Sequence, residues 1–400
     1  MRTLFQATLA LPLLTIFTCQ SVLTMGAYAL SVVIPVAAPD LGVSPESIGW
    51  LVACVYFTAM LTGLASGRLL MWLGPTRVFQ LLLLLVSAGA LMLGTGIAGA
   101  VVLGAVLIGC ASGPMNPSGS AVLVRVTPTR FRALVFSLKQ CGTPMGGMLA
   151  GTVLPALMLT FDWQFAIWSI PAIAVLAVLL TPFGRMGGRE LAAQPPVQPG
   201  GPSATRSDSV VRLLWSDPGL RAITIFGFGL AVCQMALATY LVVYLWREAG
   251  YSPAQAGLVF AVLHIAGIVA RVLLGALADR WMATRWVLVT IGFVLAGVLL
   301  AVAAISSAWP VAVVYIVMAV AGASGNGWVG LYFAELARLS PPAQVAEVAA
   351  ASQFATYLGI VCGPLMFSAM LVLLGGYGPS FIALAVVAGI CGTYLGVAGR

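Results

Sequence analysis

The sequence consists mostly of long apolar runs, each separated from the next by a short polar break. A helix that crosses the hydrocarbon core of a bilayer needs about 20 apolar residues, and the chain has twelve runs of roughly that length. Apolar residues make up 61% of the chain and charged residues only 7%, whereas about a quarter of a soluble domain is charged. So little charge cannot cover a water-facing surface, which excludes soluble enzymes, nucleic-acid-binding proteins and disordered chains.

We therefore predict an all-α membrane protein with twelve transmembrane helices. No cofactor or metal site is expected, because the seven cysteines lie inside apolar runs and none has metal-ligand spacing. The predicted spans fall near residues 9–36, 47–70, 78–95, 99–124, 133–160, 164–182, 222–245, 255–278, 286–305, 310–336, 347–372 and 379–398.

The distribution of cations predicts the orientation of the chain. With the N-terminus in the cytoplasm, fifteen of the 18 Lys and Arg residues fall on the cytoplasmic side and Arg247 alone falls on the other. Cytoplasmic loops of membrane proteins are enriched in these residues. We expect a multi-pass protein of a bacterial inner membrane with both termini in the cytoplasm. The net charge of +8 then reflects topology, so nucleic acid is not an expected partner.

The two halves of the chain repeat each other. Residues 41–49 align with residues 249–257 at an offset of 208, and Gly146 aligns with Gly359 at an offset of 213. Duplication of a six-span unit in one orientation is the architecture of a large class of transporters. The predicted domains are an N-terminal six-helix bundle at residues 1–182, a cytoplasmic linker at 183–221 and a C-terminal six-helix bundle at 222–400.

The predicted linker is rich in proline and glycine. Such a composition is typical of a flexible tether between two domains. Residues 207–215 within it could also form one short interfacial helix that ends before Pro218. Both interpretations leave six spans on either side.

A loop motif after the eighth predicted span gives the first resemblance to a known family. Residues 275–285 read Gly-Ala-Leu-Ala-Asp-Arg-Trp-Met-Ala-Thr-Arg, which resembles the cytoplasmic loop signature of the major facilitator superfamily. Its counterpart at residues 67–77 keeps the glycines and Arg77 but has Met71 and Trp72 in place of Asp and Arg. The resemblance covers the twelve spans, the linker and both loops. It implies two pseudo-symmetric bundles that give alternating access to a central site.

The loop motifs also predict a cytoplasmic gate. We expect Asp279 to face the first turn of the fifth span, where an acid is favourable by about 0.3–1 kcal/mol. In the first half, Met71 cannot make such a contact. We expect the acid to lie on the facing span instead, where Glu347 at the start of the eleventh span would pair with Arg77 or Arg68. Separately solvated charges are the alternative. The predicted gate and loop residues are Gly67, Arg77, Gly275, Asp279, Arg280, Arg285, Glu347, Arg130 and Arg132.

Ionisable residues inside the predicted spans indicate the substrate class. Lys139, the only lysine, and Arg271 lie at matching depths, about 10–12 Å inside the cytoplasmic rim. Each buried cation costs about 2.5–3.5 kcal/mol on insertion scales, so a functional role is the usual interpretation. The resemblance implies that the two cations share the cavity between the bundles. His264 lies on the same face as Arg271, although a histidine bonded to a backbone carbonyl would fit equally.

Two cations without a carboxylate attract anions. Arg271 followed by Gly275 is similar to the eighth span of monocarboxylate and oxalate-type members, where an arginine meets a carboxylate. The acid that monocarboxylate carriers place four positions earlier is Gly267 here. Neutral residues could complete the site or serve as interhelical contacts. The predicted substrate-binding residues are Arg271, Lys139, His264, Gln140, Gln353, Asn116, Gln234 and Tyr28.

The predicted function is secondary transport of a small organic anion by alternating access. Proton coupling would be indirect, through His264, a rim acid or the substrate itself. The expected partners are the anionic substrate and the lipid bilayer, with the chain acting as a monomer and not as an enzyme. Efflux of lipophilic drugs is an alternative, because residues 142–147 partly resemble a drug/proton antiporter motif, although a kink with close packing also explains them. A non-transporting receptor is the third hypothesis. Residues 325–330 fit a dinucleotide-binding pattern but are interpreted as helix packing.

Overall fold

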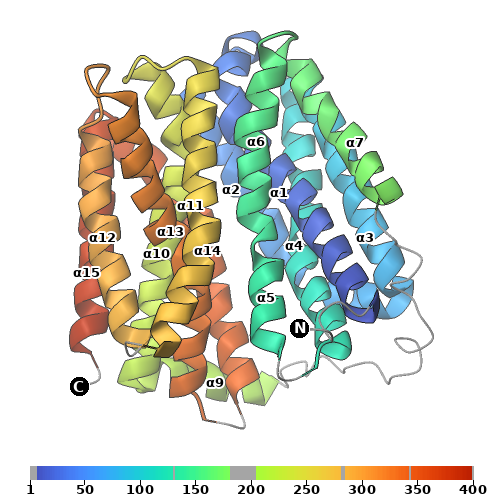
Figure 1. The fold of residues 1–400 in the computed structure, drawn as a ribbon, viewed down its shortest axis with the longest axis vertical. Helices are drawn as coiled ribbons and strands as arrows, with labels where there is room; N and C mark the ends of the chain where they lie inside the picture. The colour runs from blue at the N-terminus through green and yellow to red at the C-terminus, as the bar shows by residue number, and fades with distance from the viewer. Residues whose placement is uncertain (1–6, 129–130, 181–203, 281–283, 342–343, 399–400) are drawn as a thin grey trace. The chain divides into compact units, whose positions relative to one another are not determined.

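The computed structural model describes residues 7–128, 131–180, 204–280, 284–341 and 344–398 (Figure 1). Every regular element within these ranges is a helix. The predicted all-α membrane fold is therefore confirmed. Within the helices, the description excludes the side chains at positions 7–8, 132–134, 180, 204–209, 275–280 and 346.

Twelve helical segments of the described chain correspond in order to the twelve predicted spans. Ten of them are long and apolar enough to cross a membrane, and Trp163–Leu179 is a shorter apolar helix. The fifth span is divided into α5 and α6. The segments are α1 (Ala7–Leu41), η1 (Pro45–Ser47) with α2 (Ile48–Gly63), α3 (Ser66–Leu93), α4 (Ala98–Val126), α5 (Arg132–Gln140) with α6 (Gly142–Met158), α7 (Trp163–Leu180), α10 (Pro218–Arg247), α11 (Pro253–Arg280), α12 (Thr284–Ala303), α13 (Val311–Leu339), α14 (Val345–Leu374) and α15 (Tyr377–Val397).

The chain divides into two compact units. The first holds Met1–Pro45 and Cys54–Pro199, and the second holds Glu46–Ala53 and Gly200–Arg400. The start of α2 thus groups with the second unit, which the predicted domain boundaries do not anticipate. Within the predicted linker, the chain forms a helix, α9 (Ala204–Ser216), which packs against α10 and α14.

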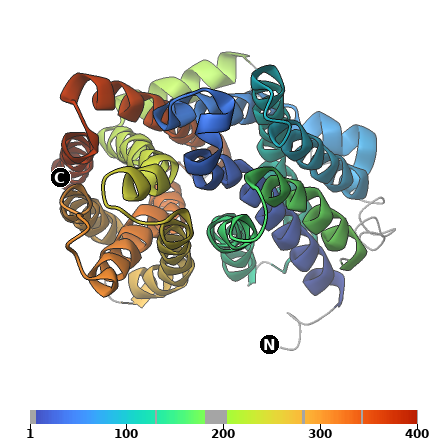
Figure 2. The ribbon, with the colours of Figure 1, turned by 90° about the horizontal axis from the view of Figure 1, so that it is seen from above.

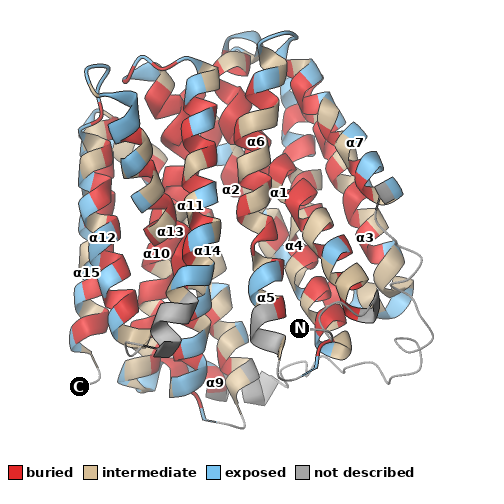
Figure 3. Ribbon diagram, in the orientation of Figure 1, coloured by how far each residue is buried: buried red, intermediate tan, exposed pale blue. Residues whose placement is uncertain are grey.

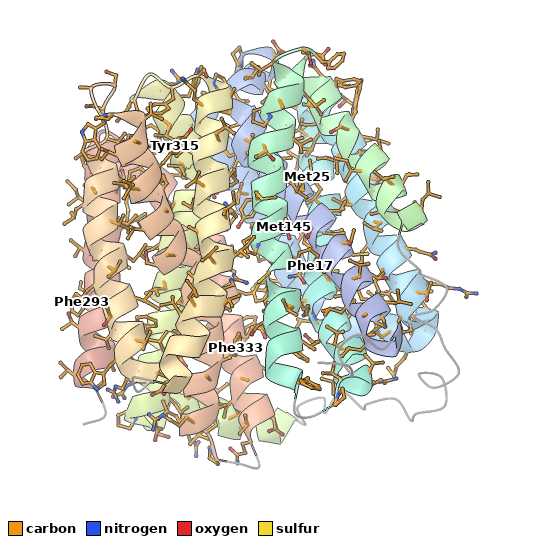
Figure 4. All side chains as sticks on the ribbon, viewed as in Figure 1. Phe17, Met25, Met145, Phe293, Tyr315 and Phe333 are labelled. Carbon is orange, nitrogen blue, oxygen red and sulfur yellow. The ribbon has the colours of Figure 1, made fainter. Side chains whose placement is uncertain are left out.

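In the first unit α1 is the central helix, and it packs against α4, α6 and α7. Nearly all of its middle part is buried. Figure 4 labels Phe17 and Met25 on α1 beside Met145 on α6. Close packing at this contact needs glycine, because a Cβ on Gly146 would lie 2.7 Å from the backbone nitrogen of Met25.

In the second unit α10 is buried along almost its whole length (Figure 3). Asp217 caps this helix, since its carboxylate accepts a hydrogen bond of 2.7 Å from the backbone N–H of Leu220. Pro218 follows at the first helical position, where its missing N–H leaves no donor unmatched. The helix packs against α14, α15, α13 and α11, and the bundle is seen from above in Figure 2.

The predicted internal repeat is visible in matching contacts within each unit. Gly146 packs against the backbone of α1 near Ser21, and Gly359 packs against the backbone of α10, with a Cβ that would lie 2.5 Å from the Phe228 carbonyl oxygen. The helices α4 and α13 both have 29 residues. They also begin and end 213 positions apart, which is the offset read from the sequence.

The predicted boundary between the second and third spans is wrong. The second span ends at Gly63, and α3 begins at Ser66, so most of the predicted loop at residues 67–77 is helical. Residues 69–73 are all apolar, and α3 continues through them because no polar residue interrupts the run. The break occurs at Gly74, whose φ of 73° only glycine adopts readily, directly before Pro75.

Candidate functional site

Lys139 lies at the end of α5, where the fifth span is broken. Pro144 has no N–H to donate to the carbonyl oxygen of Gln140, and the helix is interrupted at Cys141. The predicted kink is therefore confirmed. Close packing accompanies it, because a Cβ on Gly142 would lie 3.1 Å from the side chain of Gln20 on α1.

The ammonium group of Lys139 is buried, with 1% of the residue exposed. It donates to the carbonyl oxygen of Asn116 at 2.8 Å, to the side-chain oxygen of the same residue, and to Ser120 Oγ at 2.8 Å. An ammonium has three N–H donors, and all three are matched by neutral oxygens of α4. The structure therefore uses Lys139 to join α5 to α4, and leaves no N–H for direct contact with a carboxylate.

Arg271 lies within α11 and is half-buried. Its Nε donates to the carbonyl oxygen of Asn326 on α13 at 2.9 Å. The side-chain oxygen of Asn326 accepts a bond of 3.0 Å from Gln234 on α10, and Gln234 in turn accepts one of 3.0 Å from Trp328 Nε1. One hydrogen-bond network thus connects α10, α11 and α13 and anchors the guanidinium at its Nε.

Asn326 also explains a departure from the family pattern. A Cβ on Gly267 would lie 2.7 Å from the Cβ of Asn326. An acidic side chain four positions before Arg271 would therefore collide with Asn326. In this protein the space next to the arginine contains a neutral amide instead of a carboxylate.

The two intramembrane cations make parallel contacts in their own units. Each donates to the main-chain carbonyl of an asparagine, Lys139 to Asn116 on α4 and Arg271 to Asn326 on α13. At the repeat offset of 213, the position equivalent to Asn116 is Val329, one helical turn from Asn326. Sequence reasoning missed Asn326 because it lies among glycines. The signal that could have found it is a second asparagine at a similar depth in the corresponding span.

The remaining predicted substrate-binding residues are less distinctive. His264 is buried, and its Nδ1 lies 3.0 Å from the carbonyl oxygen of Phe260, with the two rings 4.4 Å apart. This contact fits the alternative of a packed histidine. Tyr28 is buried, while Gln140 and Gln353 are half-buried on α5 and α14.

Most of the predicted cytoplasmic gate lies outside the described residues. This holds for Arg130, for the surroundings of Gly275 and for the side chains of Arg132, Asp279 and Arg280, so the predicted contact of Asp279 stays a prediction. Gly67 is half-buried and Arg77 is exposed, both on α3, and Glu347 lies half-buried in the first turn of α14.

Arg285 has a structural contact that the loop motif does not suggest. Its Nε and Nη2 donate to the carbonyl oxygen of Leu395 at 3.1 and 2.6 Å, and Nη2 also contacts the carbonyl oxygen of Ala398. A cation at the C-terminus of a helix satisfies carbonyl groups that lack partners within the helix. Arg285 therefore stabilises the end of α15.

Among the described residues Glu335 is the only carboxylate that is buried, with 1% of the residue exposed. The predicted tenth span ends at residue 336, one residue after this acid, but α13 continues to Leu339. Arg338 binds both of its oxygens, at 2.8 and 2.6 Å. This bidentate pair neutralises the one buried acid locally.

These features define the chain as a multi-pass membrane protein with an all-helical transporter fold. The family model of the Major Facilitator Superfamily matches residues 16–364, and the chain belongs to this superfamily of transporters. A probable anion transporter from Oryza sativa subsp. japonica is 27% identical over 317 residues, which cover 73% of this chain and 72% of the relative.

Solved structures show the same fold. A bacterial homologue of the human lysosomal transporter Spinster, in an inward-facing and occupied conformation, matches with a TM-score of 0.73 at 15% identity and covers 96% of this chain and 95% of its own. A D-xylose–proton symporter matches with a TM-score of 0.72 at 14% identity and covers 98% and 97%. At these identities the likeness concerns the fold alone.

Proposed function

We propose that this transporter moves a small organic anion with a carboxylate group across a bacterial inner membrane by alternating access. The observation that carries the proposal is the guanidinium of Arg271, which lies within a membrane-spanning helix and is oriented by its Nε bond to Asn326. A guanidinium has five N–H donors in a fixed plane, and this plane matches a carboxylate. The bond from Nε to the main chain limits the orientations of the group and directs its remaining N–H donors away from Asn326.

The balance of charge supports an anionic substrate. The buried acid Glu335 is bound by Arg338, and Lys139 is bound by neutral oxygens. The neutral partners of Lys139 do not offset its positive charge, and in a medium of low dielectric this charge attracts an anion strongly. The plant relative, a probable anion transporter, points to the same class of substrate.

The roles of the two cations differ in this proposal. Arg271 binds the carboxylate directly, Asn326 anchors its Nε, and Gln234 in turn holds the side chain of Asn326. Lys139 contributes its positive charge without direct contact. The orientation with both termini in the cytoplasm, the action as a monomer, and the bundles at 1–182 and 222–400 joined by 183–221 belong to the same proposal.

Ligand-dependent thermal stability tests the substrate class. The purified full chain is heated with acetate, lactate, oxalate or succinate, and in parallel with the lipophilic cations ethidium and tetraphenylphosphonium. A ligand at one hundred times its Kd stabilises by about 2.7 kcal/mol. We expect at least one carboxylate to raise the unfolding temperature of the wild type and of Arg212→Gln, an exposed site on α9, but not of Arg271→Gln. Arg271→Lys keeps the charge but loses the fork, so it should retain a weaker response.

Stabilisation by the lipophilic cations alone, unchanged in Arg271→Gln, would support drug efflux and overturn the proposal. Proteoliposomes then distinguish a transporter from a receptor. We expect the radiolabelled form of the stabilising carboxylate to accumulate in vesicles that contain the wild type, and not in vesicles that contain Arg271→Gln.

A further inference from the structure

The ammonium group of Lys139 is buried among neutral hydrogen-bond acceptors. Its ammonium is buried and its acceptors are Asn116 and Ser120, which are neutral. Sequence reasoning assigned this cation to the substrate, but its N–H groups are directed to α4. A charge held in the membrane by neutral oxygens alone, at a break between two helices, needs another explanation.

The charged and titratable groups around Lys139 are few. Its helix packs against α1, α4 and α6, and α6 has no such residue. The helix α1 carries Cys19, Tyr28 and Asp40, and Asp40 accepts a hydrogen bond of 2.6 Å from Trp163 Nε1. The helix α4 carries Cys110 and Arg125, α5 itself carries Arg132, and Cys141 at the helix break donates to the carbonyl oxygen of Ser137 at 3.3 Å.

None of these groups offers the ammonium a counter-charge. Asp40 is the one carboxylate on the three packed helices. It lies 24 positions beyond Ile16, the α1 side chain that faces Gly119 together with Lys139. At 1.5 Å per residue this is about 36 Å along the helix. Arg125 and Arg132 have the same sign as Lys139.

We infer that Lys139, with Asn116 and Ser120, forms a proton-binding site, and that the proton is the ion coupled to transport. The step is R–NH3+ to R–NH2 plus H+, and no other bond forms or breaks. This inference rests on the proposed function, because it names the ion that moves with the organic anion.

The network can hold both protonation states. The ammonium donates three hydrogen bonds, one to each of the three oxygens. The neutral amine has two donors and one lone pair. Ser120 Oγ already donates to the carbonyl oxygen of Asn116 at 2.9 Å, so its hydroxyl can rotate and donate to the amine instead. Loss of the proton therefore leaves no buried group unmatched, which makes the site reversible.

A second observation comes from Gln20 on α1. Its amide nitrogen donates to Thr143 Oγ1 at 2.7 Å, four residues beyond Lys139 and across the helix break. Gln20 is buried, and within the described part of the chain its side-chain oxygen has no hydrogen-bond donor. The same holds for Ser118 Oγ on α4. Buried polar atoms of this kind typically bind an ordered water.

The coupling has a definite sign. Protonation of Lys139 adds one positive charge inside the membrane, and this charge favours an anion in the same low-dielectric interior. By thermodynamic linkage a bound anion favours the proton to the same extent. Proton and anion are therefore taken up together, which is symport.

The single lysine makes the site directly observable. Because Lys139 is the only lysine in the chain, protein grown with ζ-15N-lysine gives one side-chain nitrogen resonance. The full-length protein is reconstituted in lipid nanodiscs and its spectrum is recorded between about pH 5 and pH 9, the range in which a proton carrier must titrate. We expect the resonance to move from the ammonium position to the amine position within that range. A resonance that stays at the ammonium position throughout would overturn the inference.

Variants test the proposed partners. Asn116→Leu removes the side-chain oxygen, which a charged ammonium binds more strongly than a neutral amine does, so we expect its midpoint to lie about one pH unit below that of the wild type, a tenfold loss of proton affinity. The control is Ser112→Ala on the same helix. Ser112 Oγ donates to the Ile108 carbonyl oxygen at 2.8 Å, within α4, so this variant should keep the wild-type midpoint. An equal midpoint in Asn116→Leu and wild type contradicts the assigned partners.

The two proposals fail in different ways. If the Lys139 resonance stays at the ammonium position while a carboxylate still stabilises the protein through Arg271, the proton site is refuted and the substrate class is kept. A titrating Lys139 without any carboxylate response would keep the proton site and refute the substrate class.

Discussion

Gly49, in the first turn of α2, lies directly against the hydroxyl group of Tyr240 on α10. A Cβ on Gly49 would overlap this hydroxyl and would lie 2.9 Å from the carbonyl oxygen of Pro364. The hydroxyl is also 3.2 Å from the carbonyl oxygen of Glu46 and 3.3 Å from that of Pro364. Arg247 adds an ion contact of 3.7 Å to Glu46. These contacts explain why residues 46–53 belong to the second unit.

Gly49→Ala should therefore lower the thermal stability of the protein. The methyl group forces Tyr240 or the backbone near Pro364 to move, and overpacking of this kind costs about 1–3 kcal/mol. Tyr240→Phe removes the hydroxyl and should recover part of the loss in the double variant. The measurement is the unfolding temperature in detergent. The control is Gly297→Ala on α12, where a Cβ meets nothing within 4 Å; equal stability of the two alanine variants would contradict the contact.

The glycines that mark the internal repeat should be equivalent in energy as well as in position. A Cβ on Gly146 would press on Met25 at 2.7 Å, and one on Gly359 would press on Phe228 at 2.5 Å. Both neighbours are backbone atoms that cannot turn away, so each alanine variant should lose about 1–3 kcal/mol. Gly389→Ala, whose Cβ would meet only Ala296 at 3.9 Å, is the control. A loss of stability in only one of the two alanine variants would contradict the equivalence of the two positions.

The fold could be predicted because its signals are local. Twelve apolar runs of sufficient length determine twelve helices, and Pro144 alone predicts the break in the fifth span. The error at residues 67–77 arose because a loop motif outweighed five consecutive apolar residues, which continue the helix as far as Gly74.

The partners in the site could not be predicted, because they depend on packing register. Arg271 and Asn326 are 55 residues apart, and their contact requires α11 and α13 to lie side by side at one rotation. Whether Lys139 turns to α4 or to a cavity is equally a matter of helix rotation. Glu335 was placed at the end of its span because the helix length was underestimated by three residues.

The ion pair of Glu335 and Arg338 should respond asymmetrically to mutation. Arg338→Met leaves the buried carboxylate without its bidentate partner, and because the arginine side chain is itself 61% exposed, we expect a cost of about 1–3 kcal/mol, the penalty for one unmatched buried group. Glu335→Gln removes the charge itself and should cost less, and the double variant should be more stable than Arg338→Met alone. Unfolding temperatures of the three variants form a double-mutant cycle. A larger loss in Glu335→Gln than in Arg338→Met would show that the carboxylate is not confined as described.

The proposed orientation predicts which loops react from outside the cell. In a background without the seven native cysteines, Ser252→Cys lies in the exposed turn before α11, and Ser216→Cys lies exposed at the end of α9. We expect a membrane-impermeant maleimide to label Ser252→Cys in intact cells, and to label Ser216→Cys only after the cells are opened. The opposite pattern would reverse the assignment of the cytoplasmic side.

Gly267 should determine how well Arg271 is held. In Gly267→Ala the new methyl group would lie 2.7 Å from the Cβ of Asn326, so Asn326 must shift and the hydrogen bond from Gln234 must lengthen. Because Arg271 is anchored to the main chain of the same residue, its guanidinium shifts too, and a bidentate contact is sensitive to such a change in angle. We expect the apparent affinity for the best carboxylate of the panel to fall at least tenfold, and the unliganded protein to lose about 1–3 kcal/mol of stability from the overlap. Gly330→Ala on α13, where a Cβ meets nothing within 4 Å, should bind like the wild type. If Gly267→Ala unfolded early but bound the carboxylate with unchanged affinity, Asn326 would contribute to packing and not to the orientation of the arginine.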